Sequence, residues 1–336
     1  MRAEIHTREN ESRRRAAARA AVLSLALAMA VLSCSSAPKP PDAVFETKNK
    51  AAEYAKLGDQ YMAEGRYSTA LGYYEEALKA GSSVDDLEGV AASRVSMGRT
   101  YAAAGQADDA RREYEAALEY ALMARSQAAQ SAAKAGQGEL DFVAGDAKAA
   151  LALFEEAVAL AEAAGASGGD KARAVALHDR AVAKATLGDA AGAKADLAAA
   201  ESLNLKAKRW SELASNRYVL ASVLAGEENI EGALASALAA LDADKRGESA
   251  RSIPLDLAAA ASLSSRLGRD SEAWGYWRRS FESGVAVDDA ASVRKALTAL
   301  VDLADKLGKA AQKERYATLL KKLDEGEKAD AASGSR

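Results

Sequence analysis

A pair of short amphipathic helices, repeated at a regular interval, constrains this chain more than any other feature. The stretch YAKLGDQYMAEGRYSTALGYYEEAL, residues 54–78, holds one such pair. Gly65 stands between the two helices, where a chain that leaves a helix can take a positive φ. The two helical faces consist of Tyr54, Gly58 and Tyr61, and of Ala70, Tyr74 and Ala77. Small residues on both faces predict a close antiparallel approach, with the aromatic rings filling the space beside it.

The central small residue of the second helix recurs regularly through the chain. Its positions are Ala70, Ala110, Ala150, Ala193, Ala233, Ala273 and, with a lysine in place of the small residue, Lys313. Self-similarity at a regular period indicates repeated units that bury their faces on their neighbours. We therefore expect about seven helical hairpins with a period of about 40 residues, and one slightly longer step between Ala150 and Ala193. The alternative is a helical bundle without repeats, and it competes most strongly over the last three units.

Composition favours an all-α fold. Strong helix formers dominate the chain, which contains only four prolines among 336 residues. Pro254 suits the first turn of a helix, and the other three prolines precede residue 42. No sustained alternating run of β-branched residues indicates a strand.

The first unit resembles the tetratricopeptide repeat. That motif carries an aromatic residue, Leu, Gly and Tyr on its first helix, Gly at the turn, then Ala, an aromatic residue and Ala. The matching residues are Tyr54, Leu57, Gly58, Tyr61, Gly65, Ala70, Tyr74 and Ala77. The resemblance covers residues 46–324 and implies a right-handed superhelical solenoid. The usual repeat is shorter, at about 34 residues. The longer period here indicates longer helices or connections, with GSS (81–83) and GASGGD (165–170) as loops between repeats.

The N-terminus is similar to a bacterial lipoprotein signal. A basic stretch precedes an apolar run that is too short for a membrane-spanning helix, and the run ends in Val31-Leu32-Ser33-Cys34. Cys34 is the only cysteine, so it cannot form an internal disulfide. We expect residues 1–33 to be a signal peptide and Cys34 to carry acyl chains that attach the protein to a membrane. A plain secretory signal and an uncleaved anchor are the alternatives.

The segments that flank the predicted solenoid are polar. Residues 34–45 are rich in Ser and Pro and are expected to form a tether, and residues 325–336 are expected to form a disordered tail. Ser35 follows the cysteine in place of the Asp that retains many lipoproteins in the inner membrane. We therefore expect a lipid-anchored protein of the bacterial cell envelope, on the periplasmic face of the outer membrane.

Charge argues against nucleic acid as a partner. The whole chain carries a formal charge of −4 and the leader before Cys34 carries +3, so the remainder carries −7. Contacts with phosphate require clustered Lys and Arg, and the nearest cluster is KAKR (206–209).

The chain also lacks the common catalytic motifs. Only two histidines occur, His6 and His178, and there is no P-loop, HExxH or GxSxG sequence. Pairs of aspartates at 85–86, 108–109 and 288–289 fall where helices are expected to begin, which favours capping over acid–base catalysis. We expect a protein that is not an enzyme and that needs no cofactor and no metal.

The resemblance implies that the first helices of successive units line a concave groove that takes a peptide or helix of a partner protein. The groove candidates lie beside the packing face: Asp59, Met62, Arg99, Glu139, Phe142, His178, Tyr218 and Ser222. His178 can equally be a partly packed residue without a role. Trp274 and Tyr276 fit either a partner hot spot or packing against the seventh unit.

The predicted function is that of a membrane-anchored adaptor or scaffold that binds another envelope protein. One alternative is a lipoprotein of the same repeat class that partners a solute-binding protein in ligand import, which requires a continuous apolar cavity. A second alternative is self-association into homo-oligomers.

Overall fold

The computed structural model describes residues 43–165 and 168–333. The predicted signal peptide and Cys34 lie outside the described residues, as does the predicted tether up to residue 42. Within the described part there are fourteen helices and no strands. No helix among these residues is long and apolar enough to cross a membrane.

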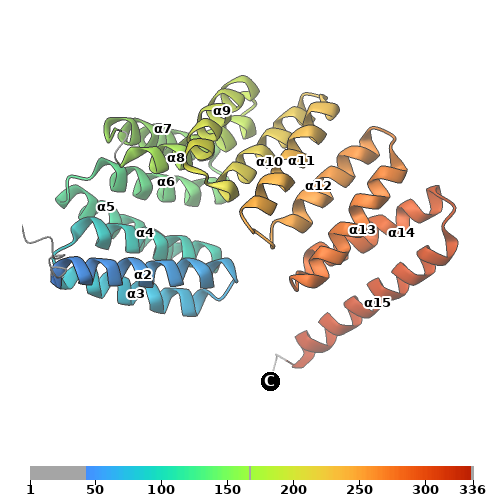
Figure 1. Ribbon diagram of the computed structural model, residues 1–336, viewed down its shortest axis with the longest axis horizontal. Helices are drawn as coiled ribbons and strands as arrows, with labels where there is room; N and C mark the ends of the chain where they lie inside the picture. Colours follow the sequence, from blue (N-terminus) through green and yellow to red (C-terminus); the bar gives the residue numbers. More distant parts are fainter. Residues whose placement is uncertain (1–42, 166–167, 334–336) are drawn as a thin grey trace, which may run out of the picture. The chain divides into compact units, whose positions relative to one another are not determined.

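The helices form seven consecutive hairpins, as the period predicts (Figure 1). The pairs are α2 (Ala43–Ala63) with α3 (Tyr67–Ser83), α4 (Leu87–Ala103) with α5 (Ala107–Met123), α6 (Gln127–Val143) with α7 (Ala147–Ala163), α8 (Gly169–Thr186) with α9 (Ala190–Ala207), α10 (Trp210–Gly226) with α11 (Ile230–Arg246), α12 (Ile253–Arg266) with α13 (Asp270–Ala286), and α14 (Ala290–Lys306) with α15 (Ala310–Ser333).

We call α2, α4, α6, α8, α10, α12 and α14 the first helices and their partners the second helices. From α3 to α14, each second helix packs against the first helix of the next hairpin. First helices also touch one another directly, in the pairs α4–α6, α6–α8, α8–α10 and α12–α14. One face of the repeat array is therefore made of first helices.

Helix and turn lengths explain the period of the repeat. Most helices contain 17 residues. Most turns contain three, so two helices and two turns make one unit of the expected length. Each three-residue turn inside a hairpin has its middle residue at positive φ, and Gly65 takes φ 73° as predicted. The one longer step, from Ala150 to Ala193, arises because the connection between α7 and α8 is two residues longer than the usual three and α8 is one residue longer than the usual 17.

One predicted loop is wrong. Helix α3 continues to Ser83, so the GSS segment forms its last turn, and the connection consists of residues 84–86. Asp85 ends the helix by taking φ 55°, which makes a longer connection unnecessary. Of the second predicted loop, GASGGD, Gly165 and Gly168 lie between α7 and α8, the last two residues begin α8, and residues 166 and 167 lie outside the described residues.

Glycine and aromatic residues determine how the first three hairpins pack. A Cβ on Gly98 would lie 2.6 Å from Cε1 of Tyr114, and a Cβ on Gly136 would overlap the same ring. The Tyr114 ring is thus held between α4 and α6 and is fully buried. Gly58 against Tyr74 and Gly138 against Phe154 repeat this contact. The predicted pairing of small and aromatic residues is confirmed.

The later hairpins keep the register but use other side chains. Leu197 of α9 occupies the position of the ring and is buried beside Ala181 and Ala193. Trp277 of α13 is 5% exposed in the core of the sixth and seventh hairpins. The ring of Trp274 meets that of Tyr316 on α15 edge-on, with 5.8 Å between their centroids, so Trp274 packs against the seventh unit.

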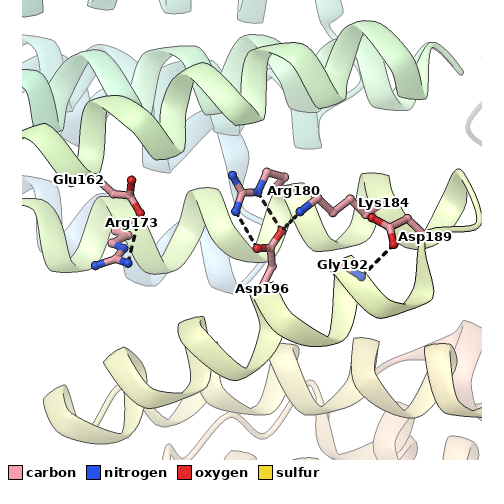
Figure 2. A network of polar contacts seen from close by, with 7 residues as sticks. All are labelled: Glu162, Arg173, Arg180, Lys184, Asp189, Gly192 and Asp196. Atoms are coloured by element: carbon pink, nitrogen blue, oxygen red, sulfur yellow. Dashed lines mark hydrogen bonds and ion pairs between the residues drawn. The ribbon is translucent and has the colours of Figure 1, made fainter.

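A buried ion cluster joins the two helices of the fourth hairpin (Figure 2). Arg180 of α8 donates two hydrogen bonds to Asp196 of α9, at 2.8 and 2.7 Å, and Lys184 donates a third at 2.8 Å. Burial by itself raises the pKa of Asp196, but the bonds from the two cations outweigh it and lower the pKa below 3.8. The cluster links α8 to α9 beside Leu197.

The paired aspartates lie at helix starts, as predicted. Asp289 caps α14 by accepting a hydrogen bond from the backbone N–H of Ser292 at 3.1 Å. Asp86 is the N-cap residue of α4 but makes no capping bond with its side chain, which pairs with Lys48 at 3.1 Å.

The helical region is longer at both ends than the predicted limits of 46 and 324. Helix α2 begins at Ala43, inside the predicted tether, and α15 continues to Ser333 through most of the predicted disordered tail. The sequence at the end of α15, DEGEKADAAS, contains no proline, and half of its residues are Ala or Glu, so it can extend a helix that has already started.

Candidate functional site

Four adjoining hollows lie along the first helices, and we call them together the inner groove. The first, of about 250 Å³, is bounded by α4, α6 and α8. The second, of about 130 Å³, lies between α8 and α10 and extends to α9. The third, of about 270 Å³, also lies between α8 and α10 and extends to α11 and α12. The fourth, of about 610 Å³, lies between α8 and α10 at the end nearer the turns of their hairpins.

Shared lining residues show that the hollows are continuous. Lys171 and Val175 line both the first and the second hollow. His178 belongs to the second and third, and Tyr218 to the third and fourth. An elongated ligand can therefore contact several hairpins at once, as recognition of a peptide in a helical groove requires.

Four of the eight predicted groove residues line these hollows. They are Arg99, His178, Tyr218 and Ser222. Tyr218 is 41% exposed, which leaves its ring accessible to a partner. The structure thus brings these four residues to one groove, and their contact with a partner stays a prediction.

The other four predicted residues contact the protein itself. Asp59 accepts a hydrogen bond from the Tyr74 hydroxyl at 2.7 Å, and the Met62 sulfur lies 3.9 Å from that hydroxyl. Phe142 packs, partly buried, on the core around Phe154. Glu139 faces Arg99 at 4.0 Å.

Asp59, Arg99 and Glu139 recur with the period of the repeat, and together with Asp179 of α8 they form one electrostatic cluster. Burial lowers the pKa of Arg99, but Glu139, Asp179 and other acidic groups outweigh it and raise the pKa. Burial, and to a smaller extent the charge of Glu139, raises the pKa of Asp179 well above its usual value, and the charge of Arg99 lowers it. The cluster holds more carboxyl groups than cations, and one oxygen of Asp179 is buried without a hydrogen-bond partner.

His178 has a neighbour that the sequence did not indicate. Its Nδ1 donates to Asn216 Oδ1 at 2.8 Å, and burial lowers the pKa of the imidazole, which is therefore neutral near pH 7. Asn216 is 2% exposed, and its Nδ2 has no acceptor. That amide leaves two N–H donors beside the second hollow, where a carbonyl group of a bound peptide can accept from them.

Two further carboxyl groups line the third hollow and were also missed. Asp244 of α11 and Asp256 of α12 are 4% and 3% exposed. Burial and then Asp244 raise the pKa of Asp256 to about 8. Neither residue carries a sequence signal of its own, because each occupies an ordinary position in an amphipathic helix.

The described residues provide no arrangement of three or more His, Cys, Asp or Glu side chains that could hold a metal ion. The inner groove instead offers apolar walls, hydrogen-bond donors and buried acidic groups. These features define a helical-repeat solenoid with a groove along its first helices.

Comparisons identify the repeat class. Residues 50–122, which lie in the first two hairpins, match the family model described as tetratricopeptide repeat. The chain therefore contains tetratricopeptide repeats, and its helical array is a tetratricopeptide-like solenoid, a fold suited to protein–protein interaction. None of the curated proteins compared with this chain is similar to it in sequence.

Solved structures share the fold. The apo form of RapI gives a TM-score of 0.63 at 13% identity, over 84% of this chain and 76% of that chain. A Rap protein complexed with competence and sporulation factor gives 0.58 at 16% identity, over 83% and 76%. A signal transduction ATPase with a tetratricopeptide repeat sensor, from Pyrococcus horikoshii, gives 0.61 at 10% identity, over 87% and 44%. At these identities the likeness concerns the fold alone.

Proposed function

We propose that this protein is an interaction scaffold of the bacterial cell envelope that binds a peptide segment or helix of a partner protein in the inner groove. The observation that carries the proposal is the continuity of four hollows along the first helices, with Tyr218 exposed among them. The unpartnered amide of Asn216 adds hydrogen-bonding groups that a guest backbone can use. Among the structures of similar fold, a Rap protein is complexed with competence and sporulation factor, which supports ligand binding by a solenoid of this kind.

The groove proposal is tested by capture in the native cell. The C-terminus is tagged, intact cells are crosslinked, and captured proteins are identified for the wild type and two variants. Ser222→Arg places a long side chain in the fourth hollow from an exposed position on α10. The matched control is Lys206→Ala with Lys208→Ala, because both lysines are exposed at the end of the second helix α9 and away from the hollows.

We expect one or more envelope proteins to be captured by the wild type and by the lysine control, and to be lost with Ser222→Arg. Capture that is equal for both variants would contradict binding in the inner groove. Capture of this protein alone would favour self-association instead.

Membrane attachment belongs to the same proposal and rests on the sequence around Cys34. Acylation of this cysteine would hold the solenoid at a membrane surface, and Ser35 favours the outer membrane. Cells that express the wild type or Cys34→Ala are labelled with palmitate. We expect the label in the wild type only, and label on the variant would contradict the anchor.

A further inference from the structure

The third hollow of the inner groove contains two acidic side chains and, among the described residues, no lysine or arginine. Asp244 lies in the last turn of α11 and Asp256 in the first turn of α12, and both line this cavity of about 270 Å³. Both residues are at least nine-tenths buried. Two carboxyl groups removed from water without a cation are costly, because burial disfavours the charged form.

The two carboxyl groups share a hydrogen bond, which protonated Asp256 donates to Asp244, and Ser249 and Ser252 also contribute side-chain hydrogen bonds to Asp244. Oδ2 of Asp256 is buried and has no hydrogen-bond partner among the residues that the structure describes. The hollow thus presents one carboxyl oxygen without a partner.

The arginines nearest in sequence are directed elsewhere. Arg246 pairs with Asp242 at 2.8 Å and lies over the ring of Trp210. Arg251 donates to the backbone carbonyl of Glu64 at 3.1 Å. Lys245, which follows Asp244, is exposed and does not line the hollow. Among the described residues no lysine or arginine lines the hollow, and a ligand that carries a cation would supply one.

We propose that this hollow binds the ammonium or guanidinium group of a Lys or Arg side chain that belongs to a peptide lying in the inner groove. We call it the cation pocket, with Asp244 and Asp256 as the ion-pairing groups. The inference rests on the proposed function, because the cation belongs to the partner's peptide that lies in the inner groove. A peptide is favoured over a free amine because the hollow opens into its neighbours through His178, Ser215, Tyr218 and Val219.

Protonation provides a second line of support. In the empty pocket burial and Asp244 raise the pKa of Asp256 to about 8, so Asp256 carries a proton at pH 7. A bound cation replaces that proton, and binding therefore strengthens as the pH rises toward 8. The other titratable groups that line the pocket are His178 from α8 and Tyr218 from α10. The lowered pKa of His178 keeps its imidazole neutral through this range.

The test compares three capped pentapeptides, Ala-Ala-X-Ala-Ala, in which X is lysine, arginine or the uncharged isostere norleucine. Each is titrated by calorimetry or NMR into the full-length protein in nonionic detergent, at pH 6.5 and at pH 8.5. Butylammonium serves as the free-amine probe. The same titrations are made with Asp256→Asn, which keeps the size of the side chain and mimics the protonated acid.

At pH 8.5 we expect the basic peptides to bind about tenfold more tightly than the norleucine peptide, the size typical of a charge-assisted hydrogen bond. Their affinity should fall about tenfold or more at pH 6.5. Asp256→Asn should abolish the preference. The matched control Asp242→Asn, which removes an exposed carboxylate from α11, should change it less than twofold.

Equal affinity for lysine and norleucine peptides in the wild type, or no binding of the basic peptides, would overturn the inference without any variant. Butylammonium that binds as tightly as the lysine peptide would overturn the assignment to a peptide side chain. Failure of the cation pocket is distinguishable from failure of the proposed function. If only the cation pocket is wrong, the wild type still captures a partner and Ser222→Arg still loses it.

Discussion

The hairpins of residues 43–163 and those of residues 169–286 differ in how their two helices meet. In the first group, glycine on one helix receives an aromatic ring from the other, as Gly98 receives Tyr114. In the second group, an alanine of the first helix faces leucine in the fourth hairpin, alanine in the fifth and Trp277 in the sixth. The turns inside the hairpins have three residues in both groups and the register is kept, although the connections between hairpins vary in the second group and α12 has 14 residues. The fold therefore depends on a small residue at a regular position and on three-residue turns, rather than on the aromatic ring.

The groups also differ in the polar groups that they present to the inner groove. In the first group Arg99 accompanies the carboxylates of Asp59 and Glu139, and Asp59 already accepts a bond from Tyr74. Buried polar atoms without a partner occur in both groups, on Tyr114 in the first and on Asn216 and Asp256 in the second. Of these, Asn216 and Asp256 line the hollows of the inner groove.

The largest effect is expected from removing an aromatic ring of the first group. Tyr114→Ala empties the space between α4 and α6, and a cavity of this kind costs about 4 kcal/mol of unfolding free energy. Denaturant unfolding followed by circular dichroism measures the loss. A cost below about 1 kcal/mol, the size of an average substitution, would show that the ring does not determine the packing of these hairpins.

The corresponding test in the second group removes the charge of the ion cluster. Asp196→Asn leaves Arg180 and Lys184 largely buried without their anion, at a cost of about 3 kcal/mol at pH 7. The lowered pKa means that the carboxylate stabilises the protein above its unfolded pKa near 3.8 and that this stability is lost as the pH falls through the folded value. The difference in unfolding free energy between wild type and variant should therefore shrink below about pH 4.

The control for the ion cluster is Asp242→Asn, because that carboxylate and its partner Arg246 are both more than half exposed. We expect a change below about 0.5 kcal/mol. Similar losses for the two variants would contradict the role assigned to burial of Asp196.

A smaller effect is expected from adding one methyl group beside Tyr114. Gly136→Ala should destabilise the protein by about 2 kcal/mol, because its Cβ overlaps a ring that Gly98 confines from the other side. A Cβ on Gly72 of α3 would meet nothing within 4 Å, so Gly72→Ala should stabilise by up to about 1 kcal/mol through helix propensity. Denaturant unfolding measures both, and stabilisation of the protein by Gly136→Ala as well as by Gly72→Ala would refute the close contact.

The smallest effect concerns the turn of the fifth hairpin. Glu228 takes φ 60° at the turn position where every other hairpin described here has a glycine. Glu228→Gly should stabilise by about 1 kcal/mol, since a residue with a Cβ is strained at positive φ. Thermal unfolding measures the gain in stability. The substitution also removes the exposed ion pair between Glu228 and Arg266, so a net loss of stability larger than the contribution of that ion pair would contradict the strain at residue 228.

Much of the fold could be predicted because it depends on local spacing. The register of Ala193, Ala233 and Ala273 located the fourth to sixth hairpins, although no aromatic residue marks the fourth and fifth. The helical part of residues 325–333 was not predicted, because a polar sequence that mixes Ala and Glu with Asp, Gly and Ser does not indicate whether it is helix or coil.

The candidate site was predicted only in part. Arg99, His178, Tyr218 and Ser222 follow from their position beside the packing face. Asn216, Asp244 and Asp256 could not be found in this way, because they come together across different hairpins. Their partners, or lack of partners, depend on how α8, α10 and α12 are placed beside one another.

The measurement that tests the central claim most directly is site-specific photocrosslinking in the native cell. A photoreactive phenylalanine replaces Tyr218 in the inner groove or Leu122, which is 56% exposed beside an apolar hollow formed by α5, α6 and α7. If the partner binds in the inner groove, position 218 gives adducts of defined mass and position 122 gives none. Adducts from position 122 alone would contradict it and assign partner binding to the surface around the second helices.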